Sequence, residues 1–268
     1  MQNDRLKALP KRYGAYALVT GASEGIGQCF AEELAKAGMN VVLVARRQDR
    51  LDALAKALEA QYKVLCPVIV ADLSSAEQLD GLLEITDKLD MGLLVCNAGF
   101  GTAGHFLDAE IETEMNMLGV NAMAVTRLVH HFGRKFKNKG AGGVILLSSI
   151  VATQGVARSA QYAATKAYVH TLGEGLQQEW RGTGLDLLIV APGPVKTGFA
   201  QRSKMNLGRT ASPEVVAQQS LRALGRQVLV HPGWLAKCMA LALSTAPRAL
   251  RVKIMSAIMG SMTQHLPR

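Results

Sequence analysis

The chain has 268 residues, of which 49% are hydrophobic and 19% are charged, and its formal net charge is +9. This length suits one large α/β domain, and the composition supports a buried core, which excludes a disordered chain. Basic residues are dispersed and only 5% of residues are aromatic, so the excess charge does not indicate nucleic-acid binding.

The cysteines and the N-terminal segment exclude further classes of protein. The four cysteines form no CxxC pair and have no zinc-ligand spacing with histidine, so neither a metal site nor a disulfide is predicted. No apolar stretch reaches the roughly 18 to 20 residues of a membrane span, and the first residues lack the apolar core of a signal peptide. A reducing, cytoplasmic setting is therefore the expectation.

The first predicted elements are a strand, a glycine-rich turn and a helix. Residues 17–20 are apolar and partly β-branched, glycines follow at positions 21, 25 and 27, and helical spacing continues to Lys36 before Gly38. The continuous apolar run at residues 41–45 is typical of a parallel strand covered on both faces. A helix is predicted over about residues 49–60.

The alternation of strands and helices continues along the chain. Strands are predicted at residues 64–71, 93–96, 143–148, 185–191 and 228–231, and helices at about residues 76–89, 110–137 and 160–181. Such alternation predicts right-handed crossovers and a Rossmann-type, doubly wound parallel α/β sheet of about seven strands with helices on both faces. We expect residues 1–231 to form this catalytic domain.

The C-terminal stretch has a different composition. Residues 234–267 are rich in Met, Ala and Leu, with basic residues spaced among them, so residues 232–268 are predicted to form an amphipathic helical extension of the same domain. One interpretation is a flap that packs on the core or on a second subunit. The other is a lid over an apolar substrate or a contact with a membrane surface.

The glycine turn after the first strand indicates a dinucleotide site. In open parallel sheets, this turn and the following helix N-terminus hold a pyrophosphate. About 20 residues later, where an NAD enzyme usually has an acidic residue, the chain has Arg46 and Arg47. Guanidinium groups favour a 2′-phosphate, so NADP(H) is the predicted cofactor. The alternative is that both arginines cap the strand in solvent and that Asp49 binds the ribose.

Five motifs in sequence order resemble the short-chain dehydrogenase/reductase family. They are TGASEGIG at residues 20–27, Asn97-Ala98-Gly99, Ser149, Tyr162 with Lys166 four residues later, and PGPVKT at residues 192–197. The resemblance covers residues 13 to about 231. The segments RYGAYALVTGASEGIG and FAEELAKAGMNVVLVARRQDRL are similar to the branch of hydroxysteroid dehydrogenases and microsomal very-long-chain 3-oxoacyl-CoA reductases. Unlike the microsomal members, this chain has no predicted N-terminal membrane span.

Reduction of a carbonyl by hydride leaves an alkoxide, so the site needs a proton donor and a group that stabilises negative oxygen. Tyr162 can be the donor, but the pKa of a free phenol lies near 10. Lys166 lies on the same helix face, and its charge would lower this pKa by about 2 to 3 units. Ser149 has the family's spacing from Tyr162 and would bond the substrate oxygen. Ser148 competes for this role, and only one of the two can face the site.

The resemblance implies the remaining roles. Asn121 would hold a water that links Lys166 to solvent, and Lys166 would also bind the nicotinamide ribose. The residues expected to bind NADP(H) are Gly21, Ser23, Glu24, Gly25, Ile26, Gly27, Arg46, Arg47, Asp72, Leu73, Asn97, Ala98, Gly99, Tyr162, Lys166, Pro192, Gly193, Val195 and Thr197. Thr20 is expected to be structural and to bond across to the Asn97 loop.

The predicted function is an NADP(H)-dependent oxidoreductase that interconverts a ketone and a secondary alcohol of a small apolar molecule, such as a 3-oxoacyl or steroid-like compound. Phe199, Met205 and Leu207 indicate an apolar pocket. One alternative is a non-catalytic NADP(H)-binding regulator or scaffold. Another is a membrane-surface lipid reductase that makes peripheral contact through the C-terminal tail. The resemblance also implies a homodimer or homotetramer, with His130 and His131 in the helix used for subunit pairing.

Overall fold

The structure is a computed structural model that describes residues 6–203 and 205–265. Its sheet has seven parallel strands in the order β3-β2-β1-β4-β5-β6-β7. The strands span Tyr16–Thr20 (β1), Asn40–Ala45 (β2), Val68–Val70 (β3), Met91–Cys96 (β4), Gly142–Leu147 (β5), Leu185–Val190 (β6) and Leu229–Val230 (β7). The prediction of a doubly wound α/β sheet with C-terminal helices is confirmed.

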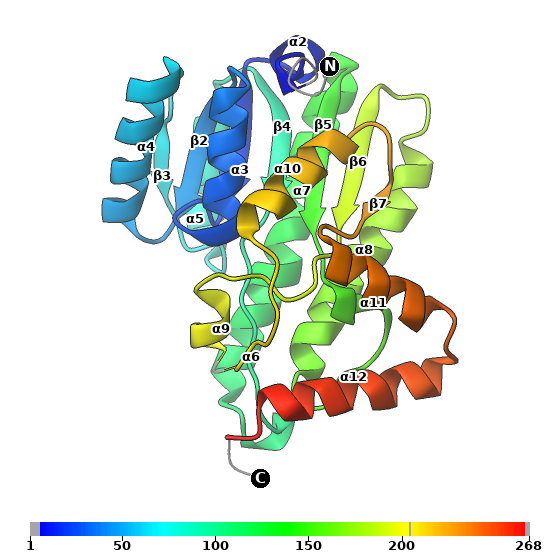
Figure 1. Cartoon of the computed structure of the whole chain (residues 1–268). Coiled ribbons are helices and arrows are strands. Elements are labelled where there is room, and N and C mark those ends of the chain that lie inside the picture. The colour runs from blue at the N-terminus through cyan, green and yellow to red at the C-terminus, as the bar shows by residue number, and fades with distance from the viewer. Residues whose placement is uncertain (1–5, 204, 266–268) are drawn as a thin grey trace.

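Helices lie on both faces of this sheet (Figure 1). They span Leu9–Tyr13 (α2), Gly25–Lys36 (α3), Gln48–Tyr62 (α4), Ala76–Asp87 (α5), Ile111–Leu118 (α6), Ala124–Lys139 (α7), Ala160–Glu179 (α8), Phe199–Arg202 (α9), Pro213–Ala223 (α10), Trp234–Ser244 (α11) and Arg248–Met262 (α12). One face of the sheet packs against α3, α4 and α10. The other face packs against α5, α7 and α8.

The central strands are apolar throughout because both of their faces are buried. In β2, Val41 and Leu43 belong to the core under α3, whereas Val42 and Val44 belong to the core under α5 and α7. All four side chains are inaccessible to solvent. Successive strand residues point to opposite faces, so a strand between two helical layers needs an unbroken apolar run.

Two predicted elements differ from the structure. The strand expected at residues 64–71 pairs with β2 only over Val68–Val70, because Pro67 has no N–H to donate to a ladder. The helix expected over residues 110–137 is interrupted by a π-helical turn at Gly119–Met123, which separates α6 from α7 and contains Asn121. Single π-helical turns inside helices occur frequently at functional sites.

The C-terminal extension forms two helices, α11 and α12, which lie beyond the carboxyl ends of the strands (Figure 1). The break falls just before Pro247, where a helix cannot continue. The inner faces of both helices contribute Leu243, Met255 and Met259 to a third apolar cluster, shared with Ile150 and Met205. Residues 266–268, the end of the predicted extension, lie outside the described residues.

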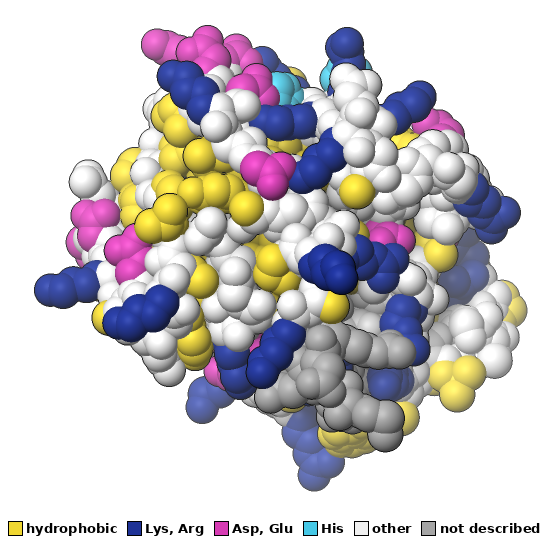
Figure 2. Space-filling view, turned by 90° about the horizontal axis from the view of Figure 1, so that it is seen from above, with side chains coloured by type: hydrophobic (Ala, Val, Ile, Leu, Met, Phe, Trp, Pro, Cys, Tyr) yellow, Lys and Arg dark blue, Asp and Glu magenta, His cyan; other side chains and the backbone are white. Residues whose placement is uncertain are grey.

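The surface carries the basic excess of the chain in dispersed form. On the face seen in Figure 2, lysine and arginine side chains are spread among polar, acidic and apolar ones. None of the helices within residues 6–203 and 205–265 is long and apolar enough to cross a membrane.

Candidate active site

The predicted site residues gather at the carboxyl edge of the sheet, around one cavity of about 940 Å³. Gly21 follows β1, Arg46 follows β2, Asn97 follows β4, Ser149 follows β5 and Pro192 follows β6. The strand order reverses between β1 and β4. In open α/β sheets, ligands bind in the crevice at this point.

The cavity is lined by all of the residues expected to bind the cofactor except Gly27. Gly27 lies beneath the turn, where a Cβ atom would be 2.2 Å from the Gly21 carbonyl oxygen. Gly25 has φ of +58°, and a Cβ atom there would be 3.0 Å from the Thr197 side chain. The turn therefore needs glycine both for its backbone conformation and for its close packing.

Thr20 links the glycine turn to the loop after β4, in the structural role expected from the sequence. Its Oγ1 accepts hydrogen bonds from the backbone N–H groups of Asn97 and Ala98, both at 3.0 Å, and donates to the Val95 carbonyl at 3.2 Å. Asn97 Nδ2 donates to the Thr20 carbonyl at 2.9 Å. These bonds fix two walls of the cavity relative to each other.

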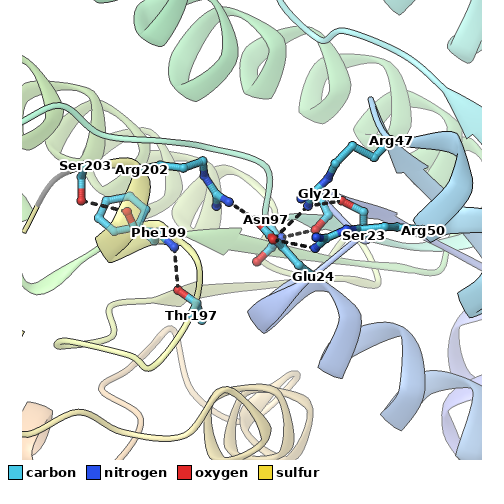
Figure 3. Close-up of polar contacts among 10 residues, drawn as sticks. All are labelled: Gly21, Ser23, Glu24, Arg47, Arg50, Asn97, Thr197, Phe199, Arg202 and Ser203. Atoms are coloured by element: carbon cyan, nitrogen blue, oxygen red, sulfur yellow. Dashed lines mark hydrogen bonds and ion pairs between the residues drawn. The ribbon is translucent and has the colours of Figure 1, made fainter.

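Arginine side chains surround the Glu24 carboxylate in the glycine turn (Figure 3). Arg47 lies 3.0 Å and Arg50 lies 3.2 Å from Glu24 Oε2, and Arg202 pairs with Oε1. Arg47 also donates a 2.9 Å hydrogen bond to Ser23 Oγ. Burial alone would raise the pKa of Glu24, but the hydrogen bond from Arg47 and the charge of Arg202 lower it below its usual value.

Arg46 and Arg47 have different surroundings. The Arg46 guanidinium is largely exposed and lies 3.8 Å from Asp72, which also accepts hydrogen bonds from the backbone and hydroxyl of Ser74. Arg47 reaches the glycine turn instead. The interpretation that both arginines only cap the strand in solvent therefore does not describe Arg47.

Tyr162 and Lys166 lie on the first turns of α8 and point into the cavity with Ser149. Lys166 Nζ donates a 2.7 Å hydrogen bond to the Leu147 carbonyl at the end of β5. Ser148 Oγ donates to the Lys166 carbonyl at 3.0 Å. Ser149 Oγ accepts from the Val151 N–H at 3.4 Å and lies close enough to the Tyr162 phenol to oppose the rise of its pKa on burial. Because the Ser148 hydroxyl is bound to the Lys166 carbonyl, Ser149 is the serine available to the phenol.

The pKa values of this pair differ from the sequence expectation. Burial raises the pKa of Tyr162 to about 12, and the nearby Ser149 hydroxyl opposes this rise. Burial lowers the pKa of Lys166 to about 8. We expected the lysine charge to lower the phenol pKa, but the burial of the phenol raises it instead. A positive charge beside the phenol would act against the effect of burial on its pKa.

Asn121 lies beneath the cavity and does not line it. Its side chain donates to the Phe100 carbonyl at 2.8 Å and to Thr165 Oγ1 at 3.1 Å, and accepts from the Phe100 N–H at 3.1 Å. A Cβ atom at residue 99 would lie 2.9 Å from Asn121 Oδ1 and 3.3 Å from Lys166 Nζ. The asparagine side chain thus approaches the lysine across Gly99, and its position in the π-helical turn brings it there.

Phe199 lines the cavity, as expected of an apolar pocket, whereas the individual residues of the wall from α11 and α12, and Arg158, were not assigned a role from the sequence. The Phe199 ring of α9 lies 5.4 Å from the Tyr162 ring, centre to centre. An apolar wall of the cavity is formed from α11 and α12 by Met239, Met255, Ile258, Met259 and Met262. Arg158 Nη1 donates to the Thr263 carbonyl at 2.8 Å and thereby anchors the end of α12. The methionine-rich composition of the tail was the available signal for this wall.

The sheet, with a glycine turn at its switch point, defines the Rossmann class of dinucleotide-binding folds. Within that class, the sequence profile described as short chain dehydrogenase matches residues 15–207. The chain belongs to the short-chain dehydrogenase family and is an oxidoreductase.

Known relatives agree with this assignment. The chain is 32% identical over 221 residues to a 7beta-hydroxysteroid dehydrogenase of Clostridium sardiniense, with 81% of this chain and 85% of that protein covered. A solved 7beta-hydroxysteroid dehydrogenase structure superposes with a TM-score of 0.86 at 28% identity, covering 92% of this chain and 98% of the other. The structure of a short-chain dehydrogenase of Sphingobium yanoikuyae in complex with NADPH superposes with a TM-score of 0.79 at 29% identity, covering 87% of this chain and 97% of the other. The predicted family and its hydroxysteroid branch are thereby confirmed.

Proposed function

We propose that this protein is an NADP(H)-dependent enzyme that interconverts a ketone and a secondary alcohol. The observation that carries the proposal is the convergence of Tyr162, Ser149 and Lys166 on the same cavity as the glycine turn and Arg47. NADP(H) supplies or accepts the hydride at the carbinol carbon. The protein residues handle the proton and the negative charge on oxygen.

In the direction of reduction, the Tyr162 hydroxyl donates its proton to the carbonyl oxygen as hydride reaches the carbonyl carbon. The Ser149 hydroxyl hydrogen-bonds the same oxygen and holds it near the phenol. The Lys166 ammonium stabilises the phenolate that remains. We also propose that Asn121 holds a water beside Lys166 through which the phenolate is reprotonated. In the direction of oxidation, Tyr162 takes up the alcohol proton.

The residues around the glycine turn fit a phosphate-bearing dinucleotide. Glycine positions that exclude any Cβ atom bring the backbone N–H groups of the turn close to the cavity. Arg47 and Ser23 lie together at the end of β2, where a 2′-phosphate would be bound. The relative solved with NADPH supports the same cofactor. Residues 1–231 would bind it, and residues 232–268 would close the substrate side.

The substrate side favours a bulky apolar molecule. Phe199, Met205 and Leu207 line the cavity and belong to the same apolar cluster as the methionine-rich wall of α11 and α12. Methionine side chains adapt to irregular apolar shapes. The similarity of this chain to 7beta-hydroxysteroid dehydrogenases supports a steroid-like secondary alcohol more than a straight acyl chain. We therefore propose a steroid-like alcohol or ketone as the substrate class.

The test is a panel of ketosteroids, 3-oxoacyl thioesters and small aromatic ketones, with NADPH and NADH compared in parallel. Consumption of NADPH with a ketosteroid, at higher kcat/KM than with NADH, is the expected result. Turnover of the 3-oxoacyl thioesters alone would contradict the steroid-like substrate class and favour an acyl substrate. If NADPH binds but no carbonyl in the panel is reduced, and no matching alcohol is oxidised with NADP⁺, the non-catalytic regulator becomes the better description.

A second candidate function is a reductase that works at a membrane surface. Its support is the outer face of α11, where Trp234 and Leu241 are 65% and 70% exposed, together with the absence of any acidic residue after Glu214 in the sequence. Basic and apolar residues on one helix favour an anionic interface. Flotation with vesicles containing anionic lipid should carry the protein, and a Trp234→Ser, Leu241→Ser variant should float less. Equal flotation of both proteins would remove this candidate.

We also propose self-association into a homodimer or homotetramer. Two large side chains are exposed on neighbouring elements: Met123 in the π-helical turn and Tyr168 on α8, with exposed fractions of 63% and 45%. The Tyr168 hydroxyl lies 2.7 Å from the Oγ1 of Thr126, three residues after Met123. Light scattering coupled to size-exclusion chromatography measures the mass directly. A mass equal to one chain at micromolar concentration would contradict the proposal.

A further inference from the structure

The short helix α9 contacts both the cofactor side and the substrate side of the cavity. At its C-terminal end, Arg202 pairs with Glu24 of the glycine turn, 178 residues away in sequence. At its N-terminal end, the Phe199 ring lies against the Tyr162 ring, with 5.4 Å between their centres. Both contacts come from a helix of only four residues, so displacement of one end moves the other.

The connection between β6 and α9 is held close to the glycine turn. The Phe199 N–H donates to Thr197 Oγ1 at 3.3 Å, and Thr197 packs against Gly25. A Cβ atom at Gly198 would lie 3.0 Å from the Arg202 guanidinium and 3.2 Å from the Glu24 carboxylate. Figure 3 shows Arg202 reaching from α9 toward Glu24. One turn of helix thus carries both the contact with the glycine turn and the contact with Tyr162.

We propose that Glu24 and Arg202 are positioning residues whose ion pair seats α9 across the cofactor cleft. The pair retains the bound dinucleotide and, through the same helix, holds Phe199 against Tyr162 at the substrate end. This inference rests on the proposed NADP(H)-dependent function. It assigns to Glu24, which we had expected only to contact the cofactor, a role in coupling the cofactor site to the substrate site.

The charges around Glu24 indicate how the cofactor would act on this pair. One carboxylate faces the guanidinium groups of Arg47, Arg50 and Arg202, so the cluster carries an excess of positive charge. A 2′-phosphate attracts Arg47 and Arg50 and leaves the Glu24 carboxylate to Arg202. The ion pair is therefore expected to be stronger with NADP(H) than with NAD(H), which has no charge at that position.

The alternative is an exposed salt bridge without consequence, because many surface ion pairs contribute nothing measurable. Two features separate this pair from that case. Glu24 is mostly buried, with 24% of its side chain exposed, and Arg202 is tied to a helix that lies against the catalytic tyrosine. A loss of the pair should therefore be measurable at both ends of the cavity.

The experiment uses the full-length protein with Arg202→Gln, Glu24→Gln, the double variant and Arg202→Lys. Arg222→Gln, at an exposed position of α10, controls for the loss of one positive charge. The rate of NADPH dissociation is measured by stopped-flow fluorescence without any carbonyl compound. The KM and kcat for the best ketone are then measured with NADPH and with NADH. Thermal unfolding confirms that each variant is folded.

The expected result for Arg202→Gln is a dissociation rate about three- to tenfold faster, with a ketone KM raised by a similar factor and kcat reduced less. The KM effect should be larger with NADPH than with NADH. In the Arg202→Gln background, Glu24→Gln should cause little further change in the NADPH dissociation rate or the ketone KM, because the two residues act through one contact. Arg202→Lys should restore part of the loss, and Arg222→Gln should behave as the wild type.

An Arg202→Gln protein that matches Arg222→Gln in both measurements would overturn the inference, as would fully additive effects of the two substitutions. If the wild type binds NADPH but reduces no carbonyl, the proposed function fails while the dissociation rates still decide whether the pair retains the cofactor. If the wild type does not bind NADPH, both proposals fall together.

Discussion

The Lys166 ammonium lies 5.8 Å from the centre of the Tyr162 ring. It is held there by the Leu147 carbonyl at the end of β5, to which it donates a 2.7 Å hydrogen bond. The cation is therefore positioned by the sheet and not by the phenol. Lys166 is buried and Tyr162 is partly exposed to the cavity, so the charge of a bound cofactor would act on the pKa values of both.

Replacing Tyr162 by Phe should abolish reduction and leave cofactor binding intact. The phenol oxygen is the only part removed, and a positioned proton donor contributes about 10²- to 10⁴-fold in rate. Steady-state turnover and NADPH titration by fluorescence measure the two properties separately. Turnover equal to that of the wild type would exclude Tyr162 as the proton donor. A protein that lost NADPH binding as well would indicate a structural role for the hydroxyl.

The rate of ketone reduction should fall as the pH rises through about 8. Burial lowers the pKa of Lys166 from its ordinary value of 10.5 to about 8, so the lysine is charged below this pH and neutral above it. The neutral amine cannot stabilise the tyrosinate left by proton donation. The pH profile of kcat/KM for the ketone checks this. A profile that stays flat to pH 10 would show that Lys166 does not titrate in the active complex.

The Arg47→Gln variant should discriminate between the two cofactors. Loss of a charged hydrogen bond to the 2′-phosphate costs about 1.5–3 kcal/mol, which is roughly a ten- to hundredfold rise in the KM for NADPH. The KM for NADH should change much less. Arg46→Gln serves as the comparison and should have a smaller effect, because Arg46 is exposed and faces Asp72. An equal rise in the KM values for NADPH and NADH would mean that Arg47 only supports the conformation of the glycine turn.

The Thr20→Val variant should be destabilised although its volume is conserved. The change leaves the buried N–H groups of Asn97 and Ala98 without their acceptor, at about 1–3 kcal/mol each. Thermal unfolding should show a lowered Tm, and NADPH affinity should weaken because the two cavity walls are no longer tied. Thr210→Val, at an exposed position, is the matched control. Equal Tm values for the two variants would contradict this role of Thr20.

Much of the fold follows from local patterns in the sequence. The apolar runs of β1, β2, β4, β5 and β6 lie within a residue or two of their predicted ends, because strands buried on both faces need unbroken apolar sequence. The errors have local causes as well. Pro67 shortens β3. The π-helical turn around Asn121 was missed because the apolar residues continue at helical spacing through it.

The parts of the site that come from one local motif could be predicted from the sequence. The parts formed where distant segments meet could not. Gly21 to Gly25 and Tyr162 with Lys166 could be placed at the cavity because each group is local in sequence. The pairing of Glu24 with Arg202 cannot be predicted from a single sequence, because the two residues are 178 positions apart and belong to no common motif. The pKa of Tyr162 was also beyond prediction, because burial depends on packing by segments such as α9 and α12.

The wall of methionines has a further consequence. The loop around Arg158 holds α12 through hydrogen bonds to Ser256 and Thr263, and neither α11 nor α12 supplies Tyr162, Lys166 or the glycine turn. Substitutions at residues 239, 255, 259 and 262 can therefore reshape what the enzyme accepts without altering how it transfers hydride. The proposed substrate wall is thus a segment of the chain separate from the residues proposed to carry the chemistry.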